Sequence, residues 1–310
     1  MTDSLKGFFA LVAASVIWGL SPIYYKALAH VPPIEVLSHR TLWSLVFFGS
    51  VLAFQARLFD VGRAFKGRNA ALKLMLSAML ISFNWGVFIW SIQVGRTVEA
   101  SLGYYIFPLI SVVVGMIVFR EGWQAGKLIA FGLACAAVIV LTVGLGAAPW
   151  VSIALALSFA AYGVIKKTSE TGPTVGVTAE VVLLAPFALA WLAWLHLGLG
   201  QTGASDVAGG AFGTSMRDTL LLIFAGPITA APLILFSYAS RRLRFATLGL
   251  VLYLNPTLQF LVAVFIFTEP LTLWHGIALP LIWLGLAVYT VSLYASERAS
   301  RRSDISSSTL

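Results

Sequence analysis

Charged side chains are scarce in this sequence. Asp, Glu, Lys and Arg together make up 10% of its 310 residues, whereas hydrophobic residues make up 59%. A soluble domain carries about 25% charged residues because its surface faces water. The composition therefore excludes an ordinary water-soluble protein and indicates a chain that lies in lipid.

Cysteine, histidine and the common catalytic motifs are also rare or absent. Cys135 is the single cysteine, so no disulfide framework can form. The sequence has four histidines and no HExxH, CxxC or Gly-x-Ser-x-Gly motif, and no Gly-rich loop ends in Gly-Lys-Ser/Thr. We therefore expect neither an enzyme nor an ATP-hydrolysing pump, and we expect no metal site and no cofactor.

Ten apolar runs are long enough to cross a bilayer. A spanning helix needs about 20 apolar residues, whereas a barrel strand has about ten residues in strict alternation. Segment 128–141 is apolar on every face, which favours helices, and we interpret the first run as a retained helix. The expected spans are 8–29, 36–56, 72–94, 98–119, 124–145, 150–166, 175–197, 219–240, 245–267 and 271–294.

The basic residues indicate the orientation of these spans. The formal net charge is +8, but Lys and Arg lie in short loops between apolar runs, so they orient the chain and indicate no nucleic-acid partner. With a cytoplasmic N-terminus, the inner loops hold all Lys and Arg residues except Lys26, Arg40, Arg96 and Arg217. We expect a multi-pass protein of the inner membrane with both termini cytoplasmic.

Two segments carry no span. The segment 198–216 is rich in Gly, Ala and Ser, which predicts a flexible outer loop. The segment 299–310 is polar and low in complexity, which predicts a disordered cytoplasmic tail.

The sequence also repeats itself with an offset of 148 residues. Segment 96–121 overlays segment 244–269, and the matches that carry weight are Arg96 with Arg244, Pro108 with Pro256, and Glu121 with Glu269. A weaker match aligns Glu35 with Glu180. We expect residues 1–147 and 148–298 to form two repeats.

Each repeat would hold five helices, an odd number, so the second copy must be inverted in the membrane. Inverted repeats are typical of transporters, because two similar halves of opposite orientation create a site that opens to either side. The sequence predicts an all-α polytopic membrane protein with ten transmembrane helices in two inverted five-helix repeats.

Six motifs are distributed along nearly the whole chain: WGLSPIYYK (18–26), EVLSHRTLWS (35–44), NWGVFIW (84–90), EASLGY (99–104), GPITAAPL (226–233) and RRLRFATLG (241–249). Together they resemble the RarD-type proteins of the EamA family, within the drug/metabolite transporter superfamily. The resemblance implies a ten-helix inner-membrane permease with a central cavity. The chain departs from the family at Phe107, where members usually have Asn before the proline of the fourth helix; Asn255 precedes the matching Pro256.

Six ionisable groups meet at one depth near the outer ends of the first, second and fourth spans. They are Lys26, Glu35, His39, Arg40, Arg96 and Glu99. Ionisable groups in a membrane cost several kcal/mol unless they are paired or hydrated. We interpret the six as a polar network that lines the substrate path or closes a gate. In the alternative interpretation, Glu35 and Glu99 stabilise helix starts and Lys26 extends to the membrane surface.

Further candidates for the substrate path lie deeper in the spans. They are Asn84, Trp85, Tyr104, Tyr105, Tyr162, Glu180, Asn255 and Gln259. Aromatic walls for an amphipathic or cationic solute could come from Trp18, Trp85, Trp90 and Tyr105. Buried amides can instead bond neighbouring helices, so a structural role stays open for Asn84 and for Asn255 with Gln259.

Movement and energy coupling have their own candidates. Pro108 and Pro256 recur in both repeats and are candidate hinges, because proline removes a backbone donor. Carboxylate and imidazole groups can titrate when partly desolvated, and the candidate proton carriers are Glu35, His39, Glu99 and Glu180. We expect a secondary-active or facilitative permease for a small metabolite or amphipathic drug-like solute, working by alternating access. The alternatives are a non-transporting scaffold or assembly subunit, and an intramembrane enzyme.

Overall fold

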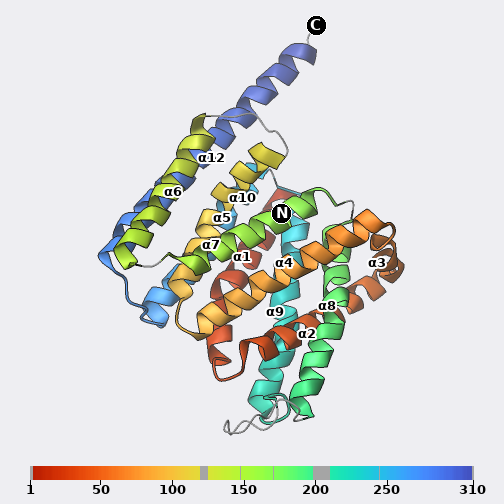
Figure 1. Cartoon of the computed structure of the whole chain (residues 1–310). Helices are drawn as coiled ribbons and strands as arrows, with labels where there is room; N and C mark the ends of the chain where they lie inside the picture. Colours follow the sequence, from red (N-terminus) through yellow and green to blue (C-terminus); the bar gives the residue numbers. More distant parts are fainter. Residues whose placement is uncertain are drawn as a thin grey trace.

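The computed structural model describes residues 3–118, 125–146, 148–169, 171–197, 210–243 and 245–308, and within these ranges all regular structure is helical. The elements are α1 (Asp3–Ala27), α2 (Pro33–Phe54), α3 (Leu58–Ala64), α4 (Arg68–Gln93), α5 (Thr97–Val118), α6 (Ala125–Leu145), α7 (Trp150–Lys167), α8 (Pro173–His196), α9 (Met216–Ser240), α10 (Phe245–Leu252), α11 (Leu254–Leu261), the π-helix η1 (Val262–Ile266) and α12 (Leu273–Ser308) (Figure 1).

Nine helices of the described chain are long and apolar enough to cross a membrane: α1, α2, α4, α5, α6, α7, α8, α9 and α12. Each lies at one of the expected spans. Large apolar side chains stand on the surface, for example Phe187 at 76% exposed and Phe265 at 74%. Such a surface suits lipid and would aggregate in water. The prediction of an all-helical polytopic membrane protein is confirmed.

The ninth expected span, 245–267, is not one regular helix. It divides at Tyr253 into α10 and α11, and α11 passes directly into η1. Pro256 has no N–H to bond the carbonyl of Leu252, so the helical ladder is interrupted at the point where α10 ends. Helix α5, whose Pro108 matches Pro256 in the predicted repeat, stays continuous.

Most packing occurs between the first half of the chain and the second. The principal pairs are α1 with α9 and α11, α2 with α8 and α9, α4 with α7 and α8, α5 with α7 and α11, and α6 with α12. Figure 1 shows α6 and α12 side by side along one flank, with α8 and α9 on the opposite flank. The two halves are therefore interleaved and do not form separate domains.

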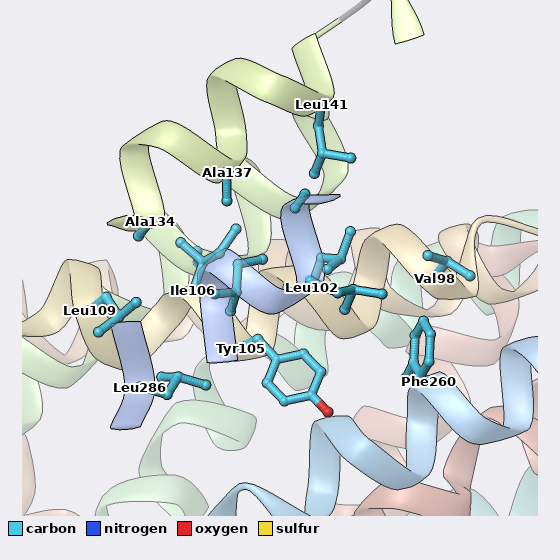
Figure 2. Close-up of a cluster of buried hydrophobic side chains, with 14 of the residues drawn as sticks. Val98, Leu102, Tyr105, Ile106, Leu109, Ala134, Ala137, Leu141, Phe260 and Leu286 are labelled. Carbon is cyan, nitrogen blue, oxygen red and sulfur yellow. The ribbon is translucent and has the colours of Figure 1, made fainter. Parts of the chain in front are cut away.

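The largest hydrophobic cluster joins α5, α6, α11 and α12, with one alanine each from α7 and η1 (Figure 2). Leu102, Ile106 and Leu109 of α5 pack among alanines of α6. Helices in a membrane associate through small residues because lipid tails are as apolar as leucine. Accordingly, a Cβ on Gly285 of α12 would lie 3.1 Å from the carbonyl oxygen of Ala130 on α6.

The structure adds one short helix, and its last helix is long. Helix α12 continues to Ser308 and extends beyond the other helices (Figure 1), while the disorder expected for residues 299–310 stays a prediction. Segment 293–308 contains neither Gly nor Pro, and each residue added to a helix gains a hydrogen bond. Helix α3 is too short to appear as an apolar run. Arg244, Glu121 and residues 198–209 of the expected outer loop lie outside the described residues.

Candidate functional site

Polar side chains gather at both ends of the helix bundle. Helix α1 ends near Lys26, and we call this side of the bundle the Lys26 end. Helix α7 ends near Lys166 on the opposite side, which we call the Lys166 end. The candidates from the sequence fall at these two ends and in the region between them.

Glu35 fixes the segment before α9 at the Lys26 end. Its side chain is 1% exposed, and Oε1 accepts hydrogen bonds from the backbone N–H groups of Ala211 at 2.6 Å and Phe212 at 3.4 Å. One turn along α2, His39 stacks on the ring of Phe212 with centroids 4.8 Å apart. Glu35 and His39 share a helix face, as predicted, and together they hold residues 211–212 against α2.

Arg96 and Glu99 form a separate ion pair at the same end. Arg96 donates from Nε and from Nη2 to the two carboxylate oxygens of Glu99, at 2.7 and 2.8 Å. The guanidinium lies over the rings of Trp90 and Trp150, which contact each other at 5.2 Å between centroids. Trp90 therefore lies against a cation of the protein itself.

Lys26 stabilises the end of a neighbouring helix. Its ammonium donates to the carbonyl oxygens of Ile92 at 3.5 Å and Gln93 at 3.3 Å, where α4 ends. The Gln93 amide donates in return to the carbonyls of Leu28 and Val31, at 2.9 and 3.1 Å. Cations stabilise helix C-termini through unpaired carbonyls and the helix dipole. These contacts favour a structural role for Lys26.

Sequence reasoning missed Glu269 as a site residue. Its two carboxylate oxygens accept hydrogen bonds from the backbone N–H groups of Thr97 and Val98, both at 2.8 Å, and so cap α5. Thr268 before it has a left-handed backbone with φ of 52°. The recurrence of Glu269 with Glu121 in the repeat was the signal that could have identified it.

Arg40 lies in the region between the two ends. It is about two turns into α2, roughly 10 Å from the helix start, and is 6% exposed. Nη1 donates to the Tyr25 hydroxyl at 2.8 Å, and the guanidinium lies 4.1 Å from the centroid of Trp85. The six ionisable groups make four separate sets of contacts in this structure: Glu35 with His39, Arg96 with Glu99, Lys26, and Arg40. Their role as one polar network stays a prediction.

Asn84 bridges three helices. Its amide nitrogen donates to the Leu155 carbonyl at 3.0 Å and to the Ser158 hydroxyl at 2.9 Å on α7, and its oxygen accepts from the Tyr104 hydroxyl of α5 at 3.1 Å. The side chain is 1% exposed and its bonding capacity is mostly used. This geometry favours the structural alternative for Asn84.

The candidates on α11 link to α5 and to each other. The hydroxyl of Tyr105, which points toward α11 in Figure 2, lies 2.8 Å from that of Thr257. Gln259 donates to the Asn255 oxygen at 2.9 Å, one turn apart as predicted. Its own oxygen is buried and has no partner among the described residues. Elsewhere, Trp18 of α1 packs 6.2 Å from Phe236.

The Lys166 end is closed by a network around Glu180. This carboxylate is 1% exposed and lies 2.9 Å from the ammonium of Lys166. It also accepts hydrogen bonds from Ser77 at 2.6 Å and Tyr162 at 3.1 Å. The structure thus brings Tyr162 and Glu180 together as candidates and adds Lys166 and Ser77, for which the sequence carried no signal beyond residue type.

The side chains around Arg40 are buried, and the central cavity implied by the resemblance stays a prediction. Trp85 is 8% exposed and Asn84 is 1% exposed. Two hollows of the described surface lie on the flanks. One is lined by α9 side chains such as Leu220 and Phe224, and the other by Gly126 of α6 and part of α12.

Comparison with known proteins places this geometry in context. The model of the family described as EamA-like transporter family matches residues 5–143. The chain is 36% identical to the "Uncharacterized transporter YojE" of Bacillus subtilis, over 96% of this chain and 98% of the relative. It is 37% identical to the protein RarD of Streptomyces exfoliatus, over 97% and 91%, and 33% identical to that of Escherichia coli, over 96% and 98%.

One solved structure, titled "Crystal structure of protein", has a TM-score of 0.56 to this chain and 17% sequence identity. It covers 93% of this chain, and the chain covers 97% of it. At this identity the likeness supports the fold alone.

Proposed function

The chain belongs to the EamA-like transporter family, and we propose that it is a permease that moves a small metabolite or amphipathic drug-like solute across the inner membrane by alternating access. The family and the names of its relatives indicate a multi-pass membrane transporter of the drug/metabolite type. One observation carries the proposal of alternating access: contacts between the two halves close both ends of the bundle around buried Arg40.

At the Lys26 end, each half of the chain holds the other. Glu35 of the first half binds residues 211–212 of the second, and Glu269 of the second half caps α5 of the first. At the Lys166 end, Glu180 of the second half binds Ser77 of the first. Lys73 also donates to the carbonyl of Thr168 at 3.2 Å. Breaking one set while keeping the other would open the bundle on one side, as alternating access requires.

The packing of the helices supports two inverted repeats of residues 1–147 and 148–298. We match α1 with α7, α2 with α8, α4 with α9, α5 with α10 and α11, and α6 with α12. If each helix is replaced by its match, a contact in one arrangement should correspond to a contact in the other. The pair α1–α9 then corresponds to α7–α4, α1–α11 to α7–α5, and α2–α9 to α8–α4, and all six pairs are in contact. The pairs α2–α8, α5–α11 and α6–α12 map onto themselves. A two-fold relation between the halves produces such a pattern.

We place the Lys26 end outside and both termini in the cytoplasm, with α10, α11 and η1 together as the tenth span. The basic residues of the loops support this orientation. Pro108 and Pro256 are the proposed hinges, and the break beside Pro256 supports that role for the second. Glu35 and Glu180 are the proposed proton carriers, since each is a buried carboxylate at one end of the bundle.

Counterflow in proteoliposomes tests the proposal. The purified protein is reconstituted with an unlabelled solute inside, and entry of the labelled solute is measured at two pH values for a panel of amino acids, organic acids and amphipathic drugs. We expect one class of solute to accumulate transiently, faster than in protein-free liposomes. A folded protein that moves no solute at either pH contradicts the proposal and favours a scaffold, whereas chemical conversion of a solute indicates an enzyme.

A further inference from the structure

We propose that Arg40 is the binding group for the carboxylate of an organic acid with an aromatic or apolar body. This inference rests on the proposed transport function and names its substrate class. It starts from an imbalance of charge: a guanidinium that is 6% exposed has no carboxylate partner among the described residues.

The buried or half-buried carboxylates of the described chain are engaged elsewhere. Glu35 binds backbone N–H groups before α9, Glu269 binds those at the start of α5, Glu99 pairs with Arg96, and Glu180 pairs with Lys166. Asp218 lies 3.1 Å from His30 at the Lys26 end. An unpaired charge in the membrane is strongly unfavourable. The opposite charge for Arg40 is therefore assigned to the solute.

Hydrogen-bond donors at Arg40 remain available for that solute. A guanidinium has five N–H donors in a rigid fork that matches a carboxylate. The structure gives Arg40 one bond within the described chain, from Nη1 to Tyr25, and its Nε is buried without a partner. Ser44 lies one turn further along α2 on the same face; its hydroxyl is fully buried and likewise unpaired among the described residues.

Aromatic rings lie next to these donors. Trp85 supports the guanidinium from α4, with a distance of 4.1 Å to the ring centroid. Tyr25, Phe88 and Tyr104 follow in edge-to-face contacts, with centroids 5.8 and 5.6 Å apart. Rings suit an apolar or aromatic solute body. The contacts of Arg40 among the described residues include no carboxylate that could receive an ammonium group. The site thus selects an organic acid over an amine or a zwitterionic amino acid.

Access to Arg40 requires movement. A solute reaches a side chain that is 6% exposed only when α1, α2 and α4 separate. The alternating access proposed above supplies such a conformation. Arg40 then has two roles: it links the three helices in the closed bundle through Tyr25 and Trp85, and it holds the anion when they part.

Matched neutral and charged probes test the assignment without using transport. The apparent Kd of phenylacetate and of its neutral isostere phenylacetamide is measured for the purified protein in detergent, from the concentration dependence of Tm. Phenethylammonium serves as the cationic probe. We expect the native protein to prefer phenylacetate over both, and Arg40→Gln to lower the preference over the amide about 10- to 100-fold, as for one lost charge-assisted contact.

Three further variants separate binding from folding. Arg40→Lys keeps the charge and should keep part of the preference for phenylacetate, while Ser44→Ala should reduce it less than Arg40→Gln. Arg63→Gln removes a guanidinium that is 71% exposed and should change nothing. Gel filtration identifies any variant that does not fold. If Arg40→Gln does not fold, the binding preference of Arg40→Lys is compared with that of the native protein in its place.

The outcomes are distinct. Equal binding of phenylacetate and phenylacetamide by the native protein overturns the assignment, as does a loss in Arg40→Gln that is the same for both. A carboxylate preference that disappears with the Arg40 charge supports it. If that preference is present but proteoliposomes move no solute, the transport proposal fails and the anion site stands. If proteoliposomes move only amines or neutral solutes, the anion site fails and transport stands.

Discussion

Replacing Glu269 with glutamine should open the Lys26 end of the bundle. The carboxylate accepts one hydrogen bond from the N–H of Thr97 and one from the N–H of Val98, both at 2.8 Å. Glutamine has nearly the same size but only one acceptor oxygen. Its amide nitrogen would face a backbone N–H, donor against donor.

The magnitude follows from those two contacts. A hydrogen bond to a charged group contributes about 1.5–3 kcal/mol. Glutamine keeps one neutral bond and loses the charge that complements the start of α5, so we estimate a net loss of about 2 kcal/mol. Because 1.4 kcal/mol is a factor of ten in an equilibrium constant, the ratio of closed to open protein at this end should fall about 30-fold.

Accessibility of Thr97 provides the assay. Its side chain is fully buried beside Glu269. Cys135, which is exposed, is first replaced by alanine, and Thr97→Cys is then labelled with a membrane-impermeant maleimide. We expect labelling about 30-fold faster in Glu269→Gln. Asp60→Asn serves as the control, because this residue pairs with arginines around α3 and touches nothing at the Lys26 end among the described contacts.

An unchanged labelling rate in Glu269→Gln would refute the reasoning, since the contact would then not hold this end closed. Equal acceleration by Asp60→Asn would show that loss of any carboxylate loosens the protein.

The remaining predictions concern helix packing and the opposite end. A Cβ at Gly19 would lie 2.6 Å from a side chain of α11, so Gly19→Ala should destabilise by about 1–3 kcal/mol in thermal unfolding, while Gly49→Ala, with open space around it, should not. Asn84→Ala removes three hydrogen bonds between helices and should cost about 1–2 kcal/mol, at roughly 0.6 kcal/mol per bond; an unchanged Tm would contradict this. Glu180→Gln breaks the pair with Lys166. In inside-out vesicles it should speed the labelling of a cysteine placed at the Lys166 end of the protein; unchanged or slower labelling would argue against a closing role.

Much of the fold follows from the sequence because spanning helices depend on local composition. Runs of apolar residues satisfy their backbone within one helix, whatever their neighbours are. For this reason the expected spans correspond to α1, α2, α4–α9 and α12. The broken ninth span was harder to predict, because Pro256 ends α10 while the matching Pro108 leaves α5 intact. The surroundings of each proline decide whether the freed carbonyl is tolerated.

For the candidate site too, local spacing could be predicted from the sequence, whereas contacts between helices could not. Residue types and spacing identified Glu35 with His39, and Asn255 with Gln259, since residues four apart share a helix face. Sequence alone did not predict that Glu180 meets Ser77 and Lys166, or that Glu269 caps α5. These contacts depend on the rotation and depth of helices that are far apart in the chain.

The membrane environment of this protein, its helices and the ionisable residues of its membrane region can be predicted from the sequence, because hydropathy and charge are properties of each segment alone. Which of these residues are neutralised within the protein depends on how the helices pack. Packing of α2 against α1 and α4 supplies Arg40 with a tyrosine and a tryptophan but, among the described residues, with no carboxylate. A charge pair forms only where two helices present opposite charges at the same depth, and that depends on the assembled bundle.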